Sequence, residues 1–206
     1  MTLFIGLTGS IGMGKSTTAS FFRDAGILVY DADAEVHDIY REEAGNLLES
    51  TFPDISNDQG IDRSKLSRHV IGNKEAMKKL EAIVHPLVQK RKQEFYNIAK
   101  EQNVFLAVLD IPLLFETASD QDVDGIVVVT APADIQRNRV LARQEMSEKK
   151  FEKLLSLQEP DSLKQQKADF IIDTSKGIEC ARQQVLMIIT DITSGCWQPQ
   201  SKRFKN

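Results

Sequence analysis

The sequence predicts an α/β protein in which helices flank a parallel sheet and a helical insertion interrupts the core. Short apolar runs that resemble strands alternate with helical segments, which favours a parallel sheet covered on both faces. A glycine-rich stretch joins the first of these runs to the first helix. The mostly helical stretch 34–102 is too long for a plain crossover between strands, so we expect it to form a subdomain.

The strands are expected in short apolar runs, of which Gly-Ile-Val-Val-Val-Thr at 125–130 is the clearest. The other expected strands are 3–8, 27–30, 104–109 and 169–172. Helices are expected at 16–25, 133–143 and 178–192. Turn residues at 53–60 interrupt the helical stretch, and Pro160 breaks the charged, helix-prone segment 145–167. The polar, basic tail 195–206 is expected to be poorly ordered.

The composition excludes several classes of protein. The 206 residues include 26 Lys and Arg against 30 Asp and Glu, a net charge of −4 that gives no electrostatic footprint for nucleic acid. Cys180 and Cys196 form neither a disulfide framework nor a zinc pattern, which favours a reducing cytoplasm. The N-terminus does not resemble a signal peptide, and no apolar run approaches the length of a membrane helix. No heptad run or conspicuous apolar patch favours either a monomer or a homo-oligomer.

The segment from Gly9 to Ser16 fits the pattern G-x-x-x-x-G-K-[ST] at every fixed position. Glycines let the backbone curl until successive N–H groups point at one anion, and the following helix directs its positive end at the same place. Lys15 is expected to reach the β- and γ-phosphates, and the Ser16 hydroxyl to bind Mg²⁺. The sequence therefore predicts a site for a nucleoside triphosphate in a P-loop type of parallel sheet.

The use of the triphosphate must be inferred from other residues. Asn73-Lys74-Glu75-Ala76 lacks the Asp of a GTPase base-reading motif, and Asp110 ends an apolar strand without the Glu that a motor ATPase would have. A small-molecule kinase needs a carboxylate near the acceptor hydroxyl, arginines for the migrating charge and a lid. A nucleoside monophosphate or sugar kinase, and a nucleotide-dependent switch, are the alternatives.

Carboxylates and arginines of the required kind follow two of the expected strands. Asp31 and Asp33 lie at the carboxyl end of the second strand, where both could face one way on extended chain. From spacing alone, Asp33 is equally well interpreted as a general base or as the cap of the next helix. Arg143, where a helix meets the charged segment, is expected to contact phosphate, whereas Arg137 and Arg139 are expected to be solvated.

Several motifs in order resemble the dephospho-CoA kinase family, over nearly the whole chain except the tail. These motifs are Gly6-Leu-Thr-Gly-Ser-Ile-Gly-Met-Gly-Lys-Ser16, Asp31-Ala-Asp33, Ile61-Asp-Arg63 with Leu66, His85-Pro86-Leu87, Ile111-Pro-Leu-Leu-Phe-Glu116, Ala142-Arg143-Gln144 and Ala168-Asp-Phe-Ile-Ile-Asp173. The resemblance implies transfer of the ATP γ-phosphate, with Mg²⁺, to the ribose 3′-hydroxyl of dephospho-CoA, the last step in making coenzyme A.

The resemblance also implies a division of the chain and a set of roles. It implies a nucleotide-binding core at 1–33, 104–143 and 168–194, a CoA-binding insertion at 34–103 and a lid at 144–167. Asp33 becomes the base, with Lys15 and Arg143 as the other catalytic residues. The implied nucleotide contacts are Gly9, Ser10, Ile11, Gly12, Met13, Gly14, Lys15, Ser16, Thr17 and Arg143. The implied substrate contacts are Thr8, Asp33, Arg63, His85, Leu113 and Glu116.

For three of these residues a structural interpretation stays open. His85 with Pro86 also fits a buried histidine at a helix break, Leu113 fits core packing, and Glu116 fits a loop carboxylate.

The sequence departs from the family pattern in two places. Ser10 stands where a second glycine is usual and Met13 where a small residue is usual; both are tolerable if φ is negative, and Met13 is expected to crowd or pack on the nucleotide. After the last strand, 173–177 reads Asp-Thr-Ser-Lys-Gly instead of the usual Asn-(Asn/Ser)-Gly. Backbone groups are therefore expected to replace side chains at the adenine edge.

Overall fold

The computed structural model describes residues 1–57, 60–144 and 146–199, which divide into two compact units. The first unit contains Met1–Tyr30 and the chain from Ala99 onward, and the second contains Asp31–Ile98. Each unit has its own cluster of buried hydrophobic residues, so each is described separately.

The first unit is built on a five-stranded sheet with the order β2-β5-β1-β6-β7. The strands are β1 Leu3–Thr8, β2 Leu28–Asp31, β5 Leu106–Asp110, β6 Gly125–Thr130 and β7 Phe170–Asp173. β1 pairs in parallel with β5 on one side and with β6 on the other, and β6 pairs in parallel with β7. The order reverses at β1, and ligands of open α/β sheets bind beyond the carboxyl ends of strands at such a point. The predicted α/β class is confirmed.

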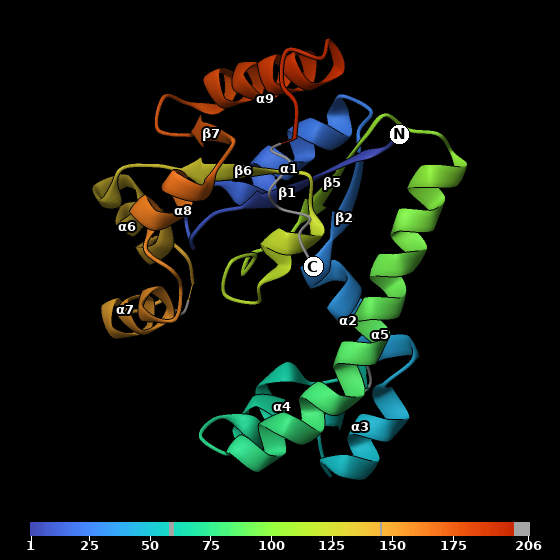
Figure 1. Ribbon diagram of the computed structural model, residues 1–206. Helices are drawn as coiled ribbons and strands as arrows, with labels where there is room; N and C mark the ends of the chain where they lie inside the picture. The colour runs from blue at the N-terminus through green and yellow to red at the C-terminus, as the bar shows by residue number, and fades with distance from the viewer. Residues whose placement is uncertain (58–59, 145, 200–206) are drawn as a thin grey trace. The chain divides into compact units, whose positions relative to one another are not determined.

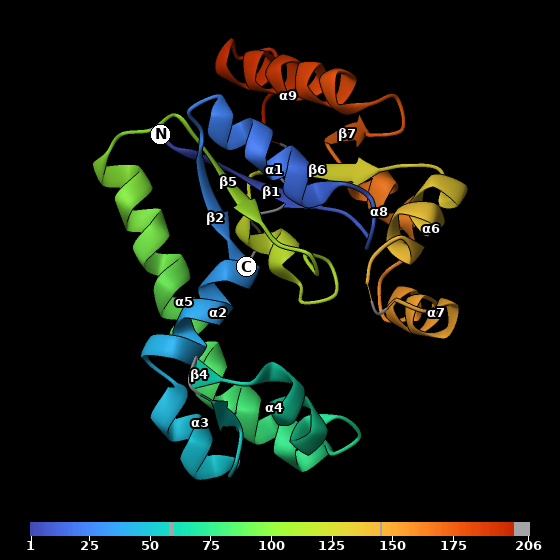
Figure 2. The ribbon, with the colours of Figure 1, turned by 180° about the vertical axis from the view of Figure 1, so that it is seen from behind.

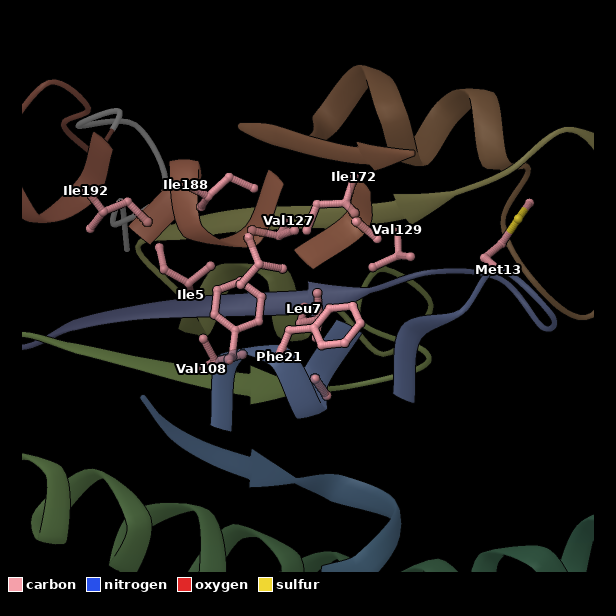
Figure 3. Packing of buried hydrophobic residues seen from close by; sticks show 14 of the residues in the cluster. Ile5, Leu7, Met13, Phe21, Val108, Val127, Val129, Ile172, Ile188 and Ile192 are labelled. Atoms are coloured by element: carbon pink, nitrogen blue, oxygen red, sulfur yellow. The ribbon is translucent and has the colours of Figure 1, made fainter. Parts of the chain in front are cut away.

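Two helices, α1 Lys15–Asp24 and α9 Ile178–Thr193, pack on one side of this sheet (Figure 1). Their buried side chains, among them Phe21 and Ile188, meet Ile5 and Val127 of the strands (Figure 3). Toward the other side, a Cβ on Gly6 would meet the side chains of Leu114 and Val123, which lie between β5 and β6. That connection includes the short 3-10 helix η1 Ser119–Asp122. The sheet is thus buried on both faces, as apolar parallel strands require.

Three helices connect β6 to β7 and lie beside that edge of the sheet in both views (Figures 1 and 2). They are α6 Ala133–Leu141, α7 Glu148–Ser156 and α8 Asp161–Lys167. α6 ends two residues before the expected end at Arg143. Pro160 is the N-cap of α8, so it begins a new helix after the break that the sequence predicted.

The second unit is mainly helical, but it is more divided than the sequence predicted. Its elements are α2 Ala32–Glu42, α3 Gly45–Thr51, β3 Ser56–Asn57, β4 Gly60–Ile61, α4 Arg63–Val70 and α5 Lys74–Glu101, which continues into the first unit. β3 and β4 form a short antiparallel pair, which the sequence analysis did not predict. The helices enclose a core that includes Ile39, Leu48, Phe52 and Leu66.

The expected helix break at His85-Pro86 does not occur, because α5 continues through Pro86. A proline inside a helix removes one hydrogen bond and costs about 3 kcal/mol. Val84 is buried in the core of the second unit, and Leu87 and Val88 pack against it, so tertiary contacts offset this cost. His85 is exposed on the helix, which excludes the interpretation as a buried histidine.

The first residues of the tail are packed against the first unit, contrary to the prediction of a poorly ordered tail. The N–H of Trp197 donates to the carbonyl of Asp191, and its ring lies 5.5 Å from that of Phe170. A Cβ on Gly125 would lie 2.6 Å from the Trp197 ring, so the indole covers the start of β6. The prediction for residues 200–206 falls outside the described residues.

Cys180 and Cys196 form no disulfide, and no helix in the described ranges could cross a bilayer.

The packing of Trp197 predicts that its replacement destabilises the first unit. Trp197→Ala should lower the free energy of unfolding by about 2 kcal/mol, less than for a fully buried Trp because this ring is partly exposed. Met187→Ala on the outer face of α9, where the side chain is 64% exposed, should change it by less than about 0.5 kcal/mol. Urea unfolding followed by circular dichroism measures both, and equal stabilities would contradict the packing argument.

Candidate active site

The glycine-rich loop joins β1 to α1 at the point where the strand order reverses. Gly12 and Gly14 have φ of 81° and 93°, a left-handed conformation that glycine adopts without strain. A Cβ on Gly12 would also overlap the side chain of Val140 on α6. Gly14 is the N-cap of α1 and provides no side-chain hydrogen bond, so the first-turn N–H groups of the helix face the loop. This arrangement suits an anion.

Ser10 and Met13, which depart from the family pattern, were predicted to be tolerated if their φ angles are negative. The structure meets this condition. Positive φ outside glycine occurs among the described residues at Asp54, Asn103 and Ala118, not in this loop. The prediction that Met13 packs on the nucleotide is wrong. Its side chain is 3% exposed, and its Sδ accepts the N–H of Ala131 at 3.1 Å. The apolar space beneath the loop holds the thioether, so the side chain of Met13 does not face a nucleotide bound at the loop.

Lys15 pairs with a buried carboxylate that the sequence analysis did not select as a site residue. Its Nζ lies 2.5 Å from Oδ1 of Asp110, whose side chain is 3% exposed. β5 runs parallel to β1 with Leu7 opposite Asp110, so the carboxylate ends beside the loop. A buried carboxylate needs a cationic partner, and this pair fixes the ammonium at the mouth of the loop. The signal in the sequence is an acid at the end of an apolar strand, although no Glu follows it.

The loop offers few protein ligands for a metal ion. Ser16 is exposed in the first turn of α1, and within the described ranges no group of three or more His, Cys, Asp or Glu could hold a metal. Mg²⁺ commonly binds through one or two protein oxygens together with substrate phosphates and water. The hydroxyl of Ser16 and the carboxylate of Asp110 are oxygen groups of that kind at the loop.

A cavity of about 390 Å³ opens beside the loop on the side of α1, α6 and α9. Its lining residues are Gly12, Gly14, Thr17, Thr18, Phe21, Arg139, Arg143, Thr174, Gly177, Ile178 and Ala181. Arg143 is exposed there, two residues beyond the end of α6. The cavity combines apolar walls with two guanidinium groups, a composition typical of nucleotide pockets.

The prediction that Arg139 is a solvated helix residue is wrong. Its guanidinium donates to Oγ1 and to the carbonyl of Thr174, both at 2.8 Å. The Thr174 hydroxyl in turn donates to the carbonyl of Met13 in the loop. This chain of hydrogen bonds fixes the segment after β7 against the loop, although that segment departs from the family pattern. Arg137 is exposed and pairs with Glu148, as a solvated residue would.

The segment after β7 is also ordered by its own carboxylate. Oδ1 of Asp173 accepts the N–H of Ser175 at 2.8 Å, and hydrogen bonds from Ser175 lower the pKa of Asp173 below its usual value. The ionised carboxylate therefore shapes the turn that leads to Gly177, the N-cap of α9.

The predicted substrate contacts of the first unit lie at the ends of β1 and β5. Thr8 is buried, and its hydroxyl donates to the carbonyl of Pro112 at 3.1 Å. Leu113 is 40% exposed, so it is not a core residue. Glu116 accepts the N–H of Glu159 at 2.7 Å and lies 2.9 Å from Nζ of the fully buried Lys164. Glu116 thus anchors the segment 158–164 to the connection after β5.

The pKa of Glu116 reflects this anchoring role. Burial raises the pKa of Glu116, but the ion pair with Lys164 and the hydrogen bond from the Glu159 N–H lower it by more, so the pKa lies below its usual value. Glu116 is therefore ionised and paired at neutral pH.

In the second unit, Asp31 and not Asp33 is the helix cap. The Asp31 carboxylate accepts the N–H of Ala34 at 3.1 Å, and Asp33 lies exposed in the first turn of α2. The expectation that both face one way on extended chain is wrong, because the helix begins at Ala32. Arg63 begins α4, and its guanidinium carbon lies 5.7 Å from the centre of the Tyr40 ring. The alternative interpretation of Asp33, as the N-cap of α2, is therefore wrong.

The buried pair predicts a pH-dependent loss of stability on mutation. Glu116→Gln should lower the free energy of unfolding by about 3 kcal/mol at pH 7, because it leaves the Lys164 charge buried and unpaired. Since the folded-state pKa of Glu116 is depressed, the advantage of the wild type is present above the unfolded pKa of about 4.3 and shrinks as pH falls below it.

Denaturant unfolding between pH 3 and pH 7 measures this difference. Glu148→Gln is the matched control, since Glu148 pairs with Arg137 at the surface and its loss should cost less than about 1 kcal/mol. A difference between Glu116→Gln and the wild type that does not change with pH would contradict the assignment.

Comparison with known proteins places this geometry in a family. A model of the family described as dephospho-CoA kinase matches residues 3–179. The dephospho-CoA kinase of Nitrobacter winogradskyi is 49% identical over 187 residues, 91% of this chain and 94% of that protein. That of Brucella melitensis is 48% identical over 191 residues, 93% of this chain and 96% of that protein.

Solved structures agree with the sequence matches. TT1252 from Thermus thermophilus has a TM-score of 0.81 at 32% identity, covering 92% of this chain and 96% of its own. Dephospho-CoA kinase from Campylobacter jejuni has a TM-score of 0.73 at 29% identity, covering 96% and 100%. Shikimate kinase from Acinetobacter baumannii, at 19% identity and a TM-score of 0.52 over 95% of each chain, shares the fold alone. The family model matches residues of both units, and the chain spans nearly the whole length of its relatives. Together with the glycine-rich loop after β1, these matches show that the chain belongs to the dephospho-CoA kinase family.

Proposed function

We propose that this protein transfers the γ-phosphoryl group of ATP to the ribose 3′-hydroxyl of dephospho-CoA, which yields coenzyme A. The observation that carries the proposal is the glycine loop with Lys15 held by Asp110, in a chain whose family match spans both units. A loop of this kind binds a polyphosphate, and the family relation supplies the acceptor.

The donor site is assigned to the first unit. The first-turn N–H groups of α1 and Lys15 bind the phosphates, and the cavity beside Arg139 and Thr174 receives the nucleoside. Thr174 is held by Arg139 and by Met13, so it forms a rigid wall without the family's usual side chains. The carbonyl of Thr174 accepts a hydrogen bond from Arg139, so we assign the contacts to the edge of the adenine base to other backbone groups of residues 175–177.

Contacts to the acceptor are assigned in each unit separately. We assign residues 34–103 as the CoA-binding insertion, with Arg63 and His85 as exposed contacts, and Leu113 as an apolar contact near the acceptor. Asp33 is exposed in the first turn of α2 and is not used as the helix cap, so its carboxylate suits the role of general base. The segment 144–167 is assigned as the lid.

In the proposed mechanism, the protein holds the two substrates in line and moves one proton. Asp33 orients the 3′-hydroxyl and accepts its proton while the oxygen attacks the γ-phosphorus. Lys15 and Arg143 stabilise the charge that spreads over the transferring group. Mg²⁺, bound with the triphosphate near Ser16, would neutralise phosphate charge. The lid excludes water, which would otherwise compete as the acceptor.

An acceptor panel tests the proposed function. The purified protein with Mg²⁺ and γ-labelled ATP should transfer label to dephospho-CoA and not to shikimate, sugars or nucleoside monophosphates. The label should appear on the ribose 3′-oxygen by phosphorus NMR. Transfer to another acceptor at a higher rate, or ATP hydrolysis without transfer, would overturn the proposal.

The base assignment predicts the behaviour of one substitution. Asp33→Asn should lower kcat by about 10²- to 10⁴-fold and leave ATP affinity within about twofold, because a general base contributes on that scale and the donor site is untouched. Asp38→Asn, on another face of α2, is the matched control and should keep kcat. Steady-state kinetics and ATP titration measure both, and a near-normal kcat for Asp33→Asn would remove it from this role.

A further inference from the structure

Glutamine side chains hold both backbone polar groups of Ile11 in the glycine loop. Nε2 of Gln136, on α6, donates to the carbonyl of Ile11 at 2.8 Å. Oε1 of Gln158, two residues after the end of α7, accepts the N–H of Ile11 at 3.0 Å. The amide orientation of Gln158 follows from chemistry, because only its oxygen can accept from an N–H.

This contact leaves the other end of the Gln158 amide available. With Oε1 bound to Ile11, Nε2 carries two N–H donors. The Gln158 side chain makes no further hydrogen bond within the described part of the chain, and its backbone N–H donates to the carbonyl of Leu155 at 3.1 Å. The side chain is half-buried, so a donor pair stands at the loop with limited access to water.

The backbone next to Gln158 is fixed, so the amide is preorganised. The N–H of Glu159 donates to Glu116, and the same carboxylate pairs with the buried Lys164. A donor held in place before the ligand arrives loses little entropy on binding.

The direction of the triphosphate in the loop brings its terminal phosphate toward Gln158. The cavity assigned to the nucleoside is lined by Gly12 and Gly14 of the loop and by Thr17 and Thr18 after it. A lysine at the position of Lys15 in such a loop reaches the β- and γ-phosphates. With the nucleoside over Thr17 and Thr18 and the terminal phosphates at Lys15, we place the phosphate chain along the loop, with its γ-phosphate beside the arm that contains Ile11.

We propose that Nε2 of Gln158 donates a hydrogen bond to the γ-phosphate and that this contact distinguishes a bound triphosphate from a diphosphate. The proposal rests on the proposed function of the loop as an ATP site. Neutral donors placed at the transferring group can also stabilise the charge that develops there.

Titration calorimetry with two nucleotides tests the proposal. The probes are Mg²⁺ complexes of a β,γ-methylene analogue of ATP, which cannot be hydrolysed, and of ADP. Gln158→Ala should weaken the analogue about tenfold or more, as expected for a hydrogen bond to a charged group, and leave ADP within about twofold. Gln158→Glu keeps an acceptor for the Ile11 N–H but removes both donors, so it should weaken the analogue at least as much.

Ser156→Ala is the matched control on the same segment. The Ser156 hydroxyl donates to the carbonyl of Lys153 within α7, so this variant should bind both nucleotides like the wild type. Equal weakening of the analogue and ADP by Gln158→Ala would show that Gln158 only shapes the loop, and wild-type analogue binding by either Gln158 variant would also overturn the proposal. Because these titrations use no acceptor, a wild-type protein that fails to phosphorylate dephospho-CoA would refute the proposed function by itself.

Discussion

The ion pair between Lys15 and Asp110 is the interaction on which the site depends. It joins the loop after β1 to the end of β5, and it exists only because these two strands lie side by side with Leu7 opposite Asp110. A carboxylate this buried is costly without a partner, so the lysine is directed to one place at the carboxyl edge of the sheet. The same edge holds the left-handed glycines and the first turn of α1. Sheet topology thereby concentrates positive charge and free N–H groups at one point.

A second set of contacts connects this point with the segment that precedes β7. The Gln158 side chain accepts a hydrogen bond from the Ile11 N–H in the loop. The N–H of Glu159 donates to the Glu116 carboxylate, which also forms an ion pair with Lys164. On the other side of the loop, Arg139 and Thr174 link α6, β7 and Met13. The residues around the loop therefore form two polar clusters, one toward the nucleoside cavity and one toward the connection after β5. The depressed pKa of Glu116 keeps the second cluster charged at neutral pH.

Local patterns in the sequence predicted the strands and the glycine loop well, because apolar runs and fixed glycine spacing need no knowledge of distant residues. Asp110 and Arg139 were missed because their roles depend on partners supplied by another strand or loop, Lys15 and Thr174 respectively. Met13, Pro86 and Trp197 were misjudged for a related reason. In each case tertiary packing, into the core or along α5, outweighed what the residue would favour by itself. Asp33 was placed at the right strand end, but the early start of α2 changed its surroundings.

We propose that backbone N–H groups at the end of β1, together with Lys15, bind a magnesium-bound triphosphate. Amide proton–nitrogen NMR spectra recorded during titration with Mg²⁺ and the β,γ-methylene ATP analogue test it most directly. We expect large shifts for the amides of Gly14, Lys15, Ser16 and Thr17, and for the Lys15 ammonium. Binding that leaves these signals in place while amides elsewhere shift would contradict it.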